Sequence, residues 1–358
     1  MLSKELVDMK RFICIIQCFF ICLLLTQSCT EEDSPNPFMS FDNSRFVDVT
    51  ANEIALNNAK EVSLPDAGVW EVQIIDDYLV TTNFGDKGLI SVFSFPDLEK
   101  LGSFFDKGNG PFELRETLSF SRMRVVSENG QTNIYIPDGK NNIINFDLTD
   151  SALFNQLSAT YKFRDIPHSM FLNIFIDDST AFCKNLAGYS DKQERFIYVN
   201  DTLIVPESMA ILNETTVPVQ NDDFMFNAIT TAFGYNPQFD IVAEASIYMN
   251  NINLYGIRND IRKTLYIGKK ISVNDVCHGG GGMKRMITMM QPYDDMFAIL
   301  TCNKRPTIVA FDWDGNYMFT LVIPDKEVSC FGFDFKRHTV YTFDSDSETM
   351  KIYDCPAI

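Results

Sequence analysis

The 358-residue chain is poor in several features that would point to particular kinds of protein. It contains only three His residues, far apart in the sequence, and no Cys-x-x-Cys pair. Because a structural zinc site needs four clustered Cys or His ligands, this scarcity argues against one. Its main apolar run, residues 12–25, is interrupted by Gln17 and is too short to span a bilayer as a helix.

Positive charge is also scarce. Residues 29–358 hold 27 Lys and Arg residues against 46 Asp and Glu residues, a net charge of −19. A field of that sign repels phosphate backbones and anionic lipid headgroups. We therefore expect no nucleic-acid partner and no electrostatic docking on a membrane. High acidity also favours solubility.

The composition is that of a globular protein, with 46% hydrophobic, 22% charged and 13% aromatic residues. These proportions exclude disorder, collagen and coiled coil as descriptions of the whole chain. The 31 Phe and 13 Tyr residues favour strands. The length allows one large all-β domain or two smaller ones.

The N-terminus has the pattern of a signal peptide. Lys10 and Arg11 precede the apolar run, and Met9 is an alternative to Met1 as the start of translation. The run ends in Leu25-Thr26-Gln27-Ser28-Cys29, which resembles a bacterial lipobox of the looser kind found in Bacteroidetes. The resemblance implies removal of residues 1–28 and attachment of a lipid to the Cys29 thiol. An ordinary cleaved signal with an incidental Cys is the alternative.

Residues 29–45 are predicted to form a flexible acidic tether. Glu31, Glu32 and Asp33 follow the predicted lipidation site, and two Pro residues come soon after. Such a polar stretch has little to bury. Its position and charge resemble the export signal of surface lipoproteins in Bacteroidetes. The expectation is an outer-membrane lipoprotein that is exposed on the cell surface, with a periplasm-facing tether as the alternative.

The rest of the chain repeats a strand-turn-strand pattern. Polar turns such as Asp76-Asp77 separate two apolar strands, and a third strand with alternating apolar residues follows, often with a fourth. Groups of this kind recur every 40 to 60 residues and number six. The pattern predicts an all-β, six-bladed β-propeller over residues 46–358, with an insertion around residues 221–226. Two stacked sandwiches are the alternative architecture.

The ends of the repeat predict how the ring closes. The last blade has only three strands of its own, and residues 60–64 form a strand without a partner before the first blade. Pairing that strand as the outer strand of blade six would remove two exposed edges. Besides Cys29, five Cys residues lie outside the signal peptide. We expect their thiols to be buried, and one disulfide between two of them is left open. The five residues are Cys183, Cys277, Cys302, Cys330 and Cys355.

A short loop after the first blade carries a family resemblance. Residues 108–113 keep Gly108, Gly110, Pro111 and Glu113 of a G-x-G-P loop, with Phe112 where many relatives have Gly. With the lipobox and the six blades, this loop resembles that of TolB-like six-bladed propeller lipoproteins of Bacteroidetes, which are similar to NHL-type propellers. The resemblance implies the fold and a location in the cell envelope, and it implies no particular reaction.

Two other motifs have competing interpretations. His278 is followed by four Gly residues, a run that can form an esterase oxyanion hole or a mobile loop between blades. No G-x-S-x-G nucleophile motif accompanies it. Asp344, Asp346 and Glu348 alternate as in a calcium loop, but Thr349 replaces the Gly that an EF-hand needs. We interpret the first motif as a flexible loop and the second as a solvated hairpin.

Basic residues gather where the innermost strands begin. In a propeller, the innermost strand of each blade begins near the mouth of the central channel. In a protein this acidic, a basic mouth would bind an anionic ligand, such as an acidic sugar or a carboxylate. Scattered, solvated strand ends are the alternative. The candidate residues are Arg122, Arg124, His168, Lys284 and Arg285.

The sequence thus predicts a lipid-anchored binding propeller, whose partner would be a small anion, a glycan or an envelope protein. It indicates no catalytic residue, metal or cofactor. The competing class is a propeller enzyme of the lactonase, lyase or glycosidase type. Such enzymes use a metal or carboxylates at the channel mouth, and fold alone does not separate the two classes.

Overall fold

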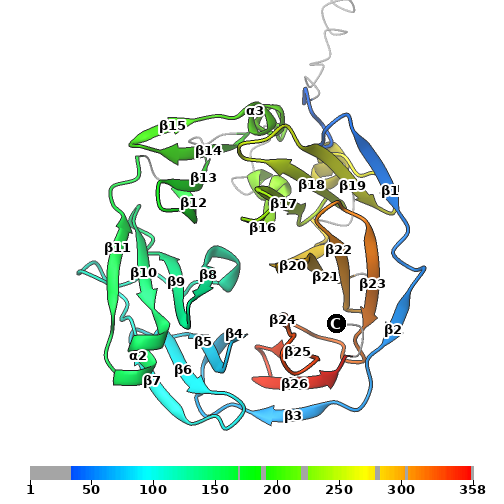
Figure 1. Cartoon of the computed structure of the whole chain (residues 1–358). Helices are drawn as coiled ribbons and strands as arrows, with labels where there is room; N and C mark the ends of the chain where they lie inside the picture. Colours follow the sequence, from blue (N-terminus) through cyan, green and yellow to red (C-terminus); the bar gives the residue numbers. More distant parts are fainter. Residues whose placement is uncertain are drawn as a thin grey trace, which may run out of the picture. The chain divides into compact units, whose positions relative to one another are not determined.

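Six β-sheets are arranged as the blades of a β-propeller in the computed structural model (Figure 1). The structure describes residues 34–167, 170–186, 191–218, 225–278, 283–302 and 305–355. The predicted signal peptide, Cys29 and His168 lie outside the described residues, as do the four Gly residues after His278. The predicted all-β fold with six blades is confirmed.

Each blade has four antiparallel strands, with the first strand innermost. Blade one comprises β4 (Val69–Ile75), β5 (Tyr78–Asn83), β6 (Ile90–Ser94) and β7 (Lys100–Phe104). Blade two comprises β8 (Arg124–Glu128), β9 (Gln131–Pro137), β10 (Ile143–Asp147) and β11 (Ala159–Phe163). Blade three comprises β12 (Met170–Asp177), β13 (Thr180–Leu186), β14 (Gln193–Val199) and β15 (Thr202–Ile204). Blade four comprises β16 (Thr231–Asn236), β17 (Ile241–Ser246), β18 (Asn251–Gly256) and β19 (Arg262–Ile267). Blade five comprises β20 (Ile287–Pro292), β21 (Met296–Thr301), β22 (Thr307–Asp312) and β23 (Tyr317–Val322). Blade six comprises β24 (Cys330–Asp334), β25 (Thr339–Asp344), β26 (Thr349–Asp354) and β3 (Lys60–Ser63).

Local sequence explains why the chain turns where it does. Asn129 and Gly130 both have positive φ angles (54° and 78°) in the β8–β9 turn. Asn200 and Asp201 likewise have φ angles of 49° and 59° between β14 and β15. Two consecutive residues of this kind form tight hairpin turns whose twist matches that of the flanking strands. The turn residues therefore fix the register of each hairpin locally.

The N-terminal part of the described chain runs along the outside of three successive blades. β1 (Ser44–Val47) adds a parallel fifth strand to β19, and β2 (Glu53–Ala55) adds a parallel fifth strand to β23. β3 then pairs antiparallel with β26, with Val62 opposite Met350. Figure 1 shows these three strands following one another along the outer edge. The sequence predicted the third strand and missed the first two.

The predicted flexible tether is wrong for residues 35–45. Met39 is completely buried and Phe41 is 4% exposed, both within the hydrophobic core that blades three and four share. The side-chain amides of Asn251 and Asn253 each donate a hydrogen bond of 2.8 Å to the Met39 carbonyl. The two apolar side chains thus anchor a stretch that is otherwise polar.

Helical segments lie in the connections between strands. They are η1 (Phe120–Arg122), α2 (Leu148–Phe154), α3 (Glu207–Asn213), η2 (Met225–Ile229) and α4 (Val273–His278). The flexible-loop interpretation is wrong for Cys277 and His278, which end helix α4. The insertion predicted around residues 221–226 falls largely outside the described residues, and the described part of that connection contains α3 and η2.

The core lies between the blades, which pack face to face through apolar side chains from alternating strand positions. Cys183 on β13 and Cys330 on β24 are completely buried, and Cys355 is 1% exposed. Burial raises the pKa of the Cys183 thiol to about 12. The prediction of buried thiols is therefore confirmed for these three residues and wrong for Cys277 and Cys302, which are only partly buried.

Candidate functional site

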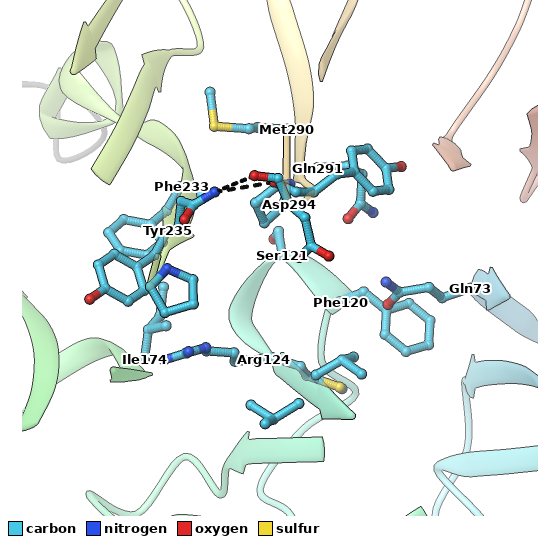
Figure 2. A pocket seen from close by; sticks show the side chains of 18 of the residues that line it. Gln73, Phe120, Ser121, Arg124, Ile174, Phe233, Tyr235, Met290, Gln291 and Asp294 are labelled. Carbon is cyan, nitrogen blue, oxygen red and sulfur yellow. Dashed lines mark hydrogen bonds between the residues drawn. The ribbon is translucent and has the colours of Figure 1, made fainter. Parts of the chain in front are cut away.

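A cavity of about 390 Å³ lies among the innermost strands (Figure 2). Among the described residues, its lining comes from β4, β8, β12, β16 and β20 and from the segments beside them, and blade six contributes nothing. The lining includes the C-terminal ends of β16 and β20. The cavity is therefore reached from the face that carries the first hairpin turn of each blade. Its volume lies within the usual range for small-molecule sites.

The 3-10 turn η1 lies across this channel. It precedes β8 of blade two and contacts β12, β16 and β20, which belong to three other blades. Ser119 caps the turn through its hydroxyl oxygen, which accepts a hydrogen bond from the Ser121 N–H. The Phe120 N–H donates to the carboxylate of Glu71 on blade one, at 2.8 Å. Because Phe120 and Ser121 both line the cavity, η1 forms part of its wall.

Among the predicted basic residues that the structure describes, Arg124 alone lines the cavity. Its guanidinium lies 5.4 Å from the ring centroid of Phe175 and 5.1 Å from that of Tyr235. One of its terminal nitrogens, Nη1, donates to the carbonyls of Phe175 and Ile176. Burial lowers the pKa of Arg124, yet the group stays charged at neutral pH. Within the described part of the chain, no carboxylate forms an ion pair with it.

Side-chain amides and carboxylates complete the polar lining. Gln73 comes from blade one and Gln291 from blade five, and both amides point towards the cavity in Figure 2. In the described ranges, no protein group forms a hydrogen bond with the Gln73 side chain. Glu128 and Asp294 line the cavity from blades two and five. With Arg124, these carboxylates give the lining a formal charge of −1.

Aromatic residues supply much of the apolar lining. Phe120 comes from the turn η1, Phe233 and Tyr235 come from blade four, and Tyr293 comes from blade five. The Tyr235 hydroxyl donates to Asp240 at 2.9 Å, which fixes the ring against Arg124. The cavity therefore presents aromatic rings beside amide, carboxylate and guanidinium groups.

The predicted basic ring at the strand starts does not form. Arg122 instead pairs with Glu116, with Nη1 and Oε1 2.9 Å apart, and is absent from the cavity lining. Lys284 and Arg285 are exposed and are likewise absent from it. Of the four candidates that the structure describes, only Arg124 lines the cavity.

The loop of residues 108–113 is held together by its own contacts. The Glu113 carboxylate accepts a hydrogen bond of 2.6 Å from the Gly110 N–H, and Lys140 donates to the carbonyls of both residues. The Phe112 ring stacks on Tyr161 with centroids 4.7 Å apart. A Cβ on Gly108 would lie 2.0 Å from Glu113 Oε2. These contacts give Gly108, Gly110 and Glu113 a role in joining blades one and two, and Pro111 belongs to the same turn.

The other two motifs also have structural roles. The exposed His278 has its Nδ1 atom 3.3 Å from the Asn274 carbonyl in the same helix. Asp344 accepts hydrogen bonds from the Asp346 N–H at 3.0 Å and from the Ser347 hydroxyl at 2.6 Å, as in a hairpin turn. Across the ranges that the structure describes, no group of three or more His, Cys, Asp or Glu residues could hold a metal ion.

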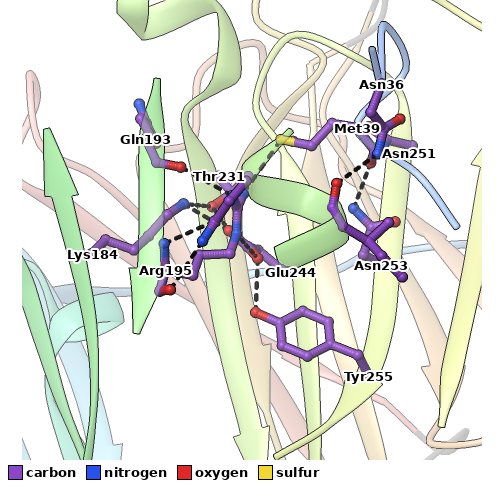
Figure 3. Close-up of polar contacts among 12 residues, drawn as sticks. Asn36, Met39, Lys184, Gln193, Arg195, Thr231, Glu244, Asn251, Asn253 and Tyr255 are labelled. Atoms are coloured by element: carbon purple, nitrogen blue, oxygen red, sulfur yellow. Dashed lines mark hydrogen bonds and ion pairs between the residues drawn. The ribbon is translucent and has the colours of Figure 1, made fainter. Parts of the chain in front are cut away.

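A buried ionic cluster joins blades three and four (Figure 3). The Glu244 carboxylate on β17 lies 2.7 Å from Lys184 Nζ and 2.7 Å from Arg195 Nε, and it accepts 2.9 Å and 2.5 Å bonds from Tyr255 and Thr231. Burial alone would raise the pKa of Glu244, but the two cations lower it well below its ordinary value. Burial also lowers the pKa of Lys184, to about 8. The cluster is closed to solvent, so we assign it to stability.

No helix in the described part of the chain is long and apolar enough to cross a membrane. No protein-family model matches the chain, and no curated protein matches it. The resemblance to TolB-like lipoproteins therefore remains a prediction.

Solved structures resemble the chain in fold. A Bacteroides fragilis protein assigned as exported has a TM-score of 0.48 at 10% identity, over 86% of this chain and 99% of that one. Raptor from Chaetomium thermophilum has a TM-score of 0.45 at 13% identity, over 83% of this chain. The matched region spans only 29% of Raptor. Likeness at this level carries no information about ligand or activity.

Proposed function

We propose that this protein is a lipoprotein of the cell envelope that binds a saccharide in its central cavity. The observation that carries the proposal is the lining of the cavity. Aromatic rings stand beside an amide, Gln73, that has no hydrogen-bond partner among the described residues. Such a site combines an apolar surface with a few convergent polar groups, as small-molecule sites do.

The chemistry of a sugar ring fits this lining. Its C–H groups carry partial positive charge and pack against the negative face of an aromatic ring such as Tyr235 or Tyr293. Its hydroxyl groups both donate and accept hydrogen bonds. Gln73 and Gln291 offer both kinds of partner, Glu128 and Asp294 accept, and Arg124 donates.

The charge of the lining weighs against a simple anion. Arg124 faces two carboxylates in the same cavity, and Nη1 is already bound to backbone carbonyls. A neutral saccharide therefore fits better than the anionic ligand expected from the sequence. An acidic sugar remains a testable variant, because the remaining N–H groups of Arg124 could bind its carboxylate.

The proposed location rests on the N-terminal sequence. The apolar run, the lipobox-like residues and Cys29 support export and lipid attachment. Ordered packing that begins near residue 36 would leave only a few residues between Cys29 and the propeller. The domain would therefore be held close to the membrane surface.

Binding can be measured by calorimetry on the purified full-length chain, with neutral saccharides and uronic acids as probes. We expect the double variant Gln73→Ala/Gln291→Ala to lose most of the affinity, because both amides face the cavity. Arg122→Gln is the matched control outside the cavity and should bind normally. Unchanged binding by the double variant, or no binding of any probe by the wild type, would reject the proposal.

Hydrolysis of the saccharide is the second candidate function. Glu128 and Asp294 reach the same cavity from two blades, and glycosidases use pairs of carboxylates. Release of reducing sugar by the wild type, and its loss in both Glu128→Gln and Asp294→Asn, would establish an enzyme. Binding without such release would establish a binding protein.

A further inference from the structure

We infer that the ligand is a chain of sugar units, which leaves the cavity over Tyr293 and stacks on the exposed ring of Phe335. This inference rests on the proposed function and specifies the class of saccharide. It adds a second binding subsite outside the cavity, on the turn between β24 and β25 of blade six.

Tyr293 connects the cavity to this turn. Its ring belongs to the cavity lining, and its hydroxyl accepts a hydrogen bond of 3.0 Å from the Phe333 N–H of blade six. Its ring centroid lies 5.1 Å from that of Phe335, with an interplanar angle of 75°. Tyr293 therefore contacts the cavity on one side and Phe335 on the other.

Phe335 is exposed but held in place. Its side chain is 43% exposed, and its ring centroid lies 5.9 Å from that of Phe333, which is 5% exposed. The next two residues, Lys336 and Arg337, both pair with Asp77 of blade one. Contacts on both sides thus fix the turn, so stacking a ligand on Phe335 would cost little conformational entropy.

Tyr293 is the part of the cavity lining that lies next to blade six. Blades one to five line the cavity, whereas none of the described residues of blade six does. A sugar unit within the cavity that is extended over Tyr293 would next meet Phe335. This continuity distinguishes Phe335 from other exposed aromatic residues, such as Phe154 on α2, which is 68% exposed.

The test compares affinity for oligosaccharides of increasing length. The probes are cello-, malto- and xylo-oligosaccharides and galacturonate oligomers, each from the single sugar to the hexamer, titrated into the full-length chain. We expect affinity to rise with length beyond the units that fill the cavity. Phe335→Ala should remove that rise, a loss of about threefold to tenfold for the longest probe, and leave short probes unaffected.

Two further variants separate stacking from general damage. Phe335→Trp should keep the dependence on length, and Phe154→Ala should behave as the wild type. If affinity is equal at every length yet sensitive to Gln73→Ala/Gln291→Ala, the subsite is rejected and the proposed function stands. If Phe335→Ala leaves the rise intact, the subsite is likewise rejected. If no probe binds, the proposed function itself fails.

Discussion

Arg337 of blade six donates a hydrogen bond to Asp77 of blade one, with Nη2 and Oδ1 2.9 Å apart. This contact joins the first and last blades on the face where the cavity opens. The adjacent Asp76 accepts hydrogen bonds from Ser127 and Thr132 of blade two, at 2.9 and 2.6 Å. One Asp-Asp turn therefore links a blade to both of its neighbours.

A second Asp-Asp turn makes the same kind of link. Asp177 of blade three pairs with Arg258 of blade four, and Asp178 pairs with Lys162 of blade two. The recurring carboxylates thus connect neighbouring blades through ion pairs and hydrogen bonds. Their equivalent positions in the repeat explain why the sequence shows them in pairs.

The link between the first and last blades should contribute modestly to stability. We expect Asp77→Asn to lower the free energy of unfolding by no more than about 1 kcal/mol, because Asp77 is 58% exposed. Hydrogen bonds from Lys336 and Arg337 lower the pKa of Asp77, so the contribution is present at neutral pH and disappears in acid. Urea unfolding at low and high salt measures it. Asp86→Asn is the control, and an equal effect there would contradict the assignment.

The packed N-terminal segment should contribute far more to the stability of the protein than the link between the first and last blades. We expect Met39→Ala to lower the free energy of unfolding by about 2–5 kcal/mol, the usual cost of truncating a buried Met. Met318→Ala, at a residue that is 39% exposed, should cost much less. Chemical denaturation of both variants gives the comparison. A negligible effect of Met39→Ala would mean that residues 35–45 are a flexible tether after all.

The buried cluster predicts an unusual dependence on pH. Because burial lowers the pKa of Lys184 to about 8, the unfolded chain binds more protons than the folded chain from about pH 8 to 10. Stability should therefore rise with pH in that range, by up to about 1.4 kcal/mol per pH unit. Lys184→Met should flatten the curve, whereas Lys87→Met, at an exposed position, should not. A rise that survives in Lys184→Met would come from another group.

The loop between blades one and two should affect folding and leave binding unchanged. We expect Gly108→Ala to destabilise the protein by about 1 kcal/mol, because the new methyl group would displace the Glu113 carboxylate from its hydrogen bond with the Gly110 N–H. In Gly108→Ala/Glu113→Ala no carboxylate is left to displace, so the combined loss should be smaller than the sum of the single losses. Thermal unfolding of the wild type, Gly108→Ala, Glu113→Ala and the double variant measures the four stabilities that this comparison needs. Strict additivity would contradict the proposed contact.

Lipid attachment can be tested directly by mass spectrometry of the protein isolated from membranes. We expect the mature chain to begin at Cys29 and to carry the mass of a diacylglyceryl group. Cys29→Ser should remain unmodified and be released from the membrane fraction. A wild-type chain with an unmodified N-terminus would contradict the anchor.

The blades could be predicted because their determinants are local. Alternating apolar residues define the strands, and pairs such as Asn129-Gly130 define the turns. β1 and β2 were missed because both strands are short and their side chains are mostly exposed. Met39 and Phe41 were missed because two buried residues within an otherwise polar stretch form too short a pattern to recognise.

The site was harder to predict than the fold. Arg124 was found, but its basic neighbours were wrongly grouped with it, because the path of η1 across the channel has no signal in the sequence. Gln73 and Gln291 do have a signal, since each interrupts an apolar innermost strand. The cluster of Lys184, Arg195 and Glu244 depends on two blades meeting. Such contacts between distant residues do not follow from spacing.

The most direct test of the proposed binding site is a crystal structure of the full-length chain with the saccharide that binds best in calorimetry. The account predicts electron density for a sugar ring between Gln73 and Gln291, within reach of the Arg124 guanidinium. A sugar bound at another surface, with the cavity empty at saturating ligand, would contradict it.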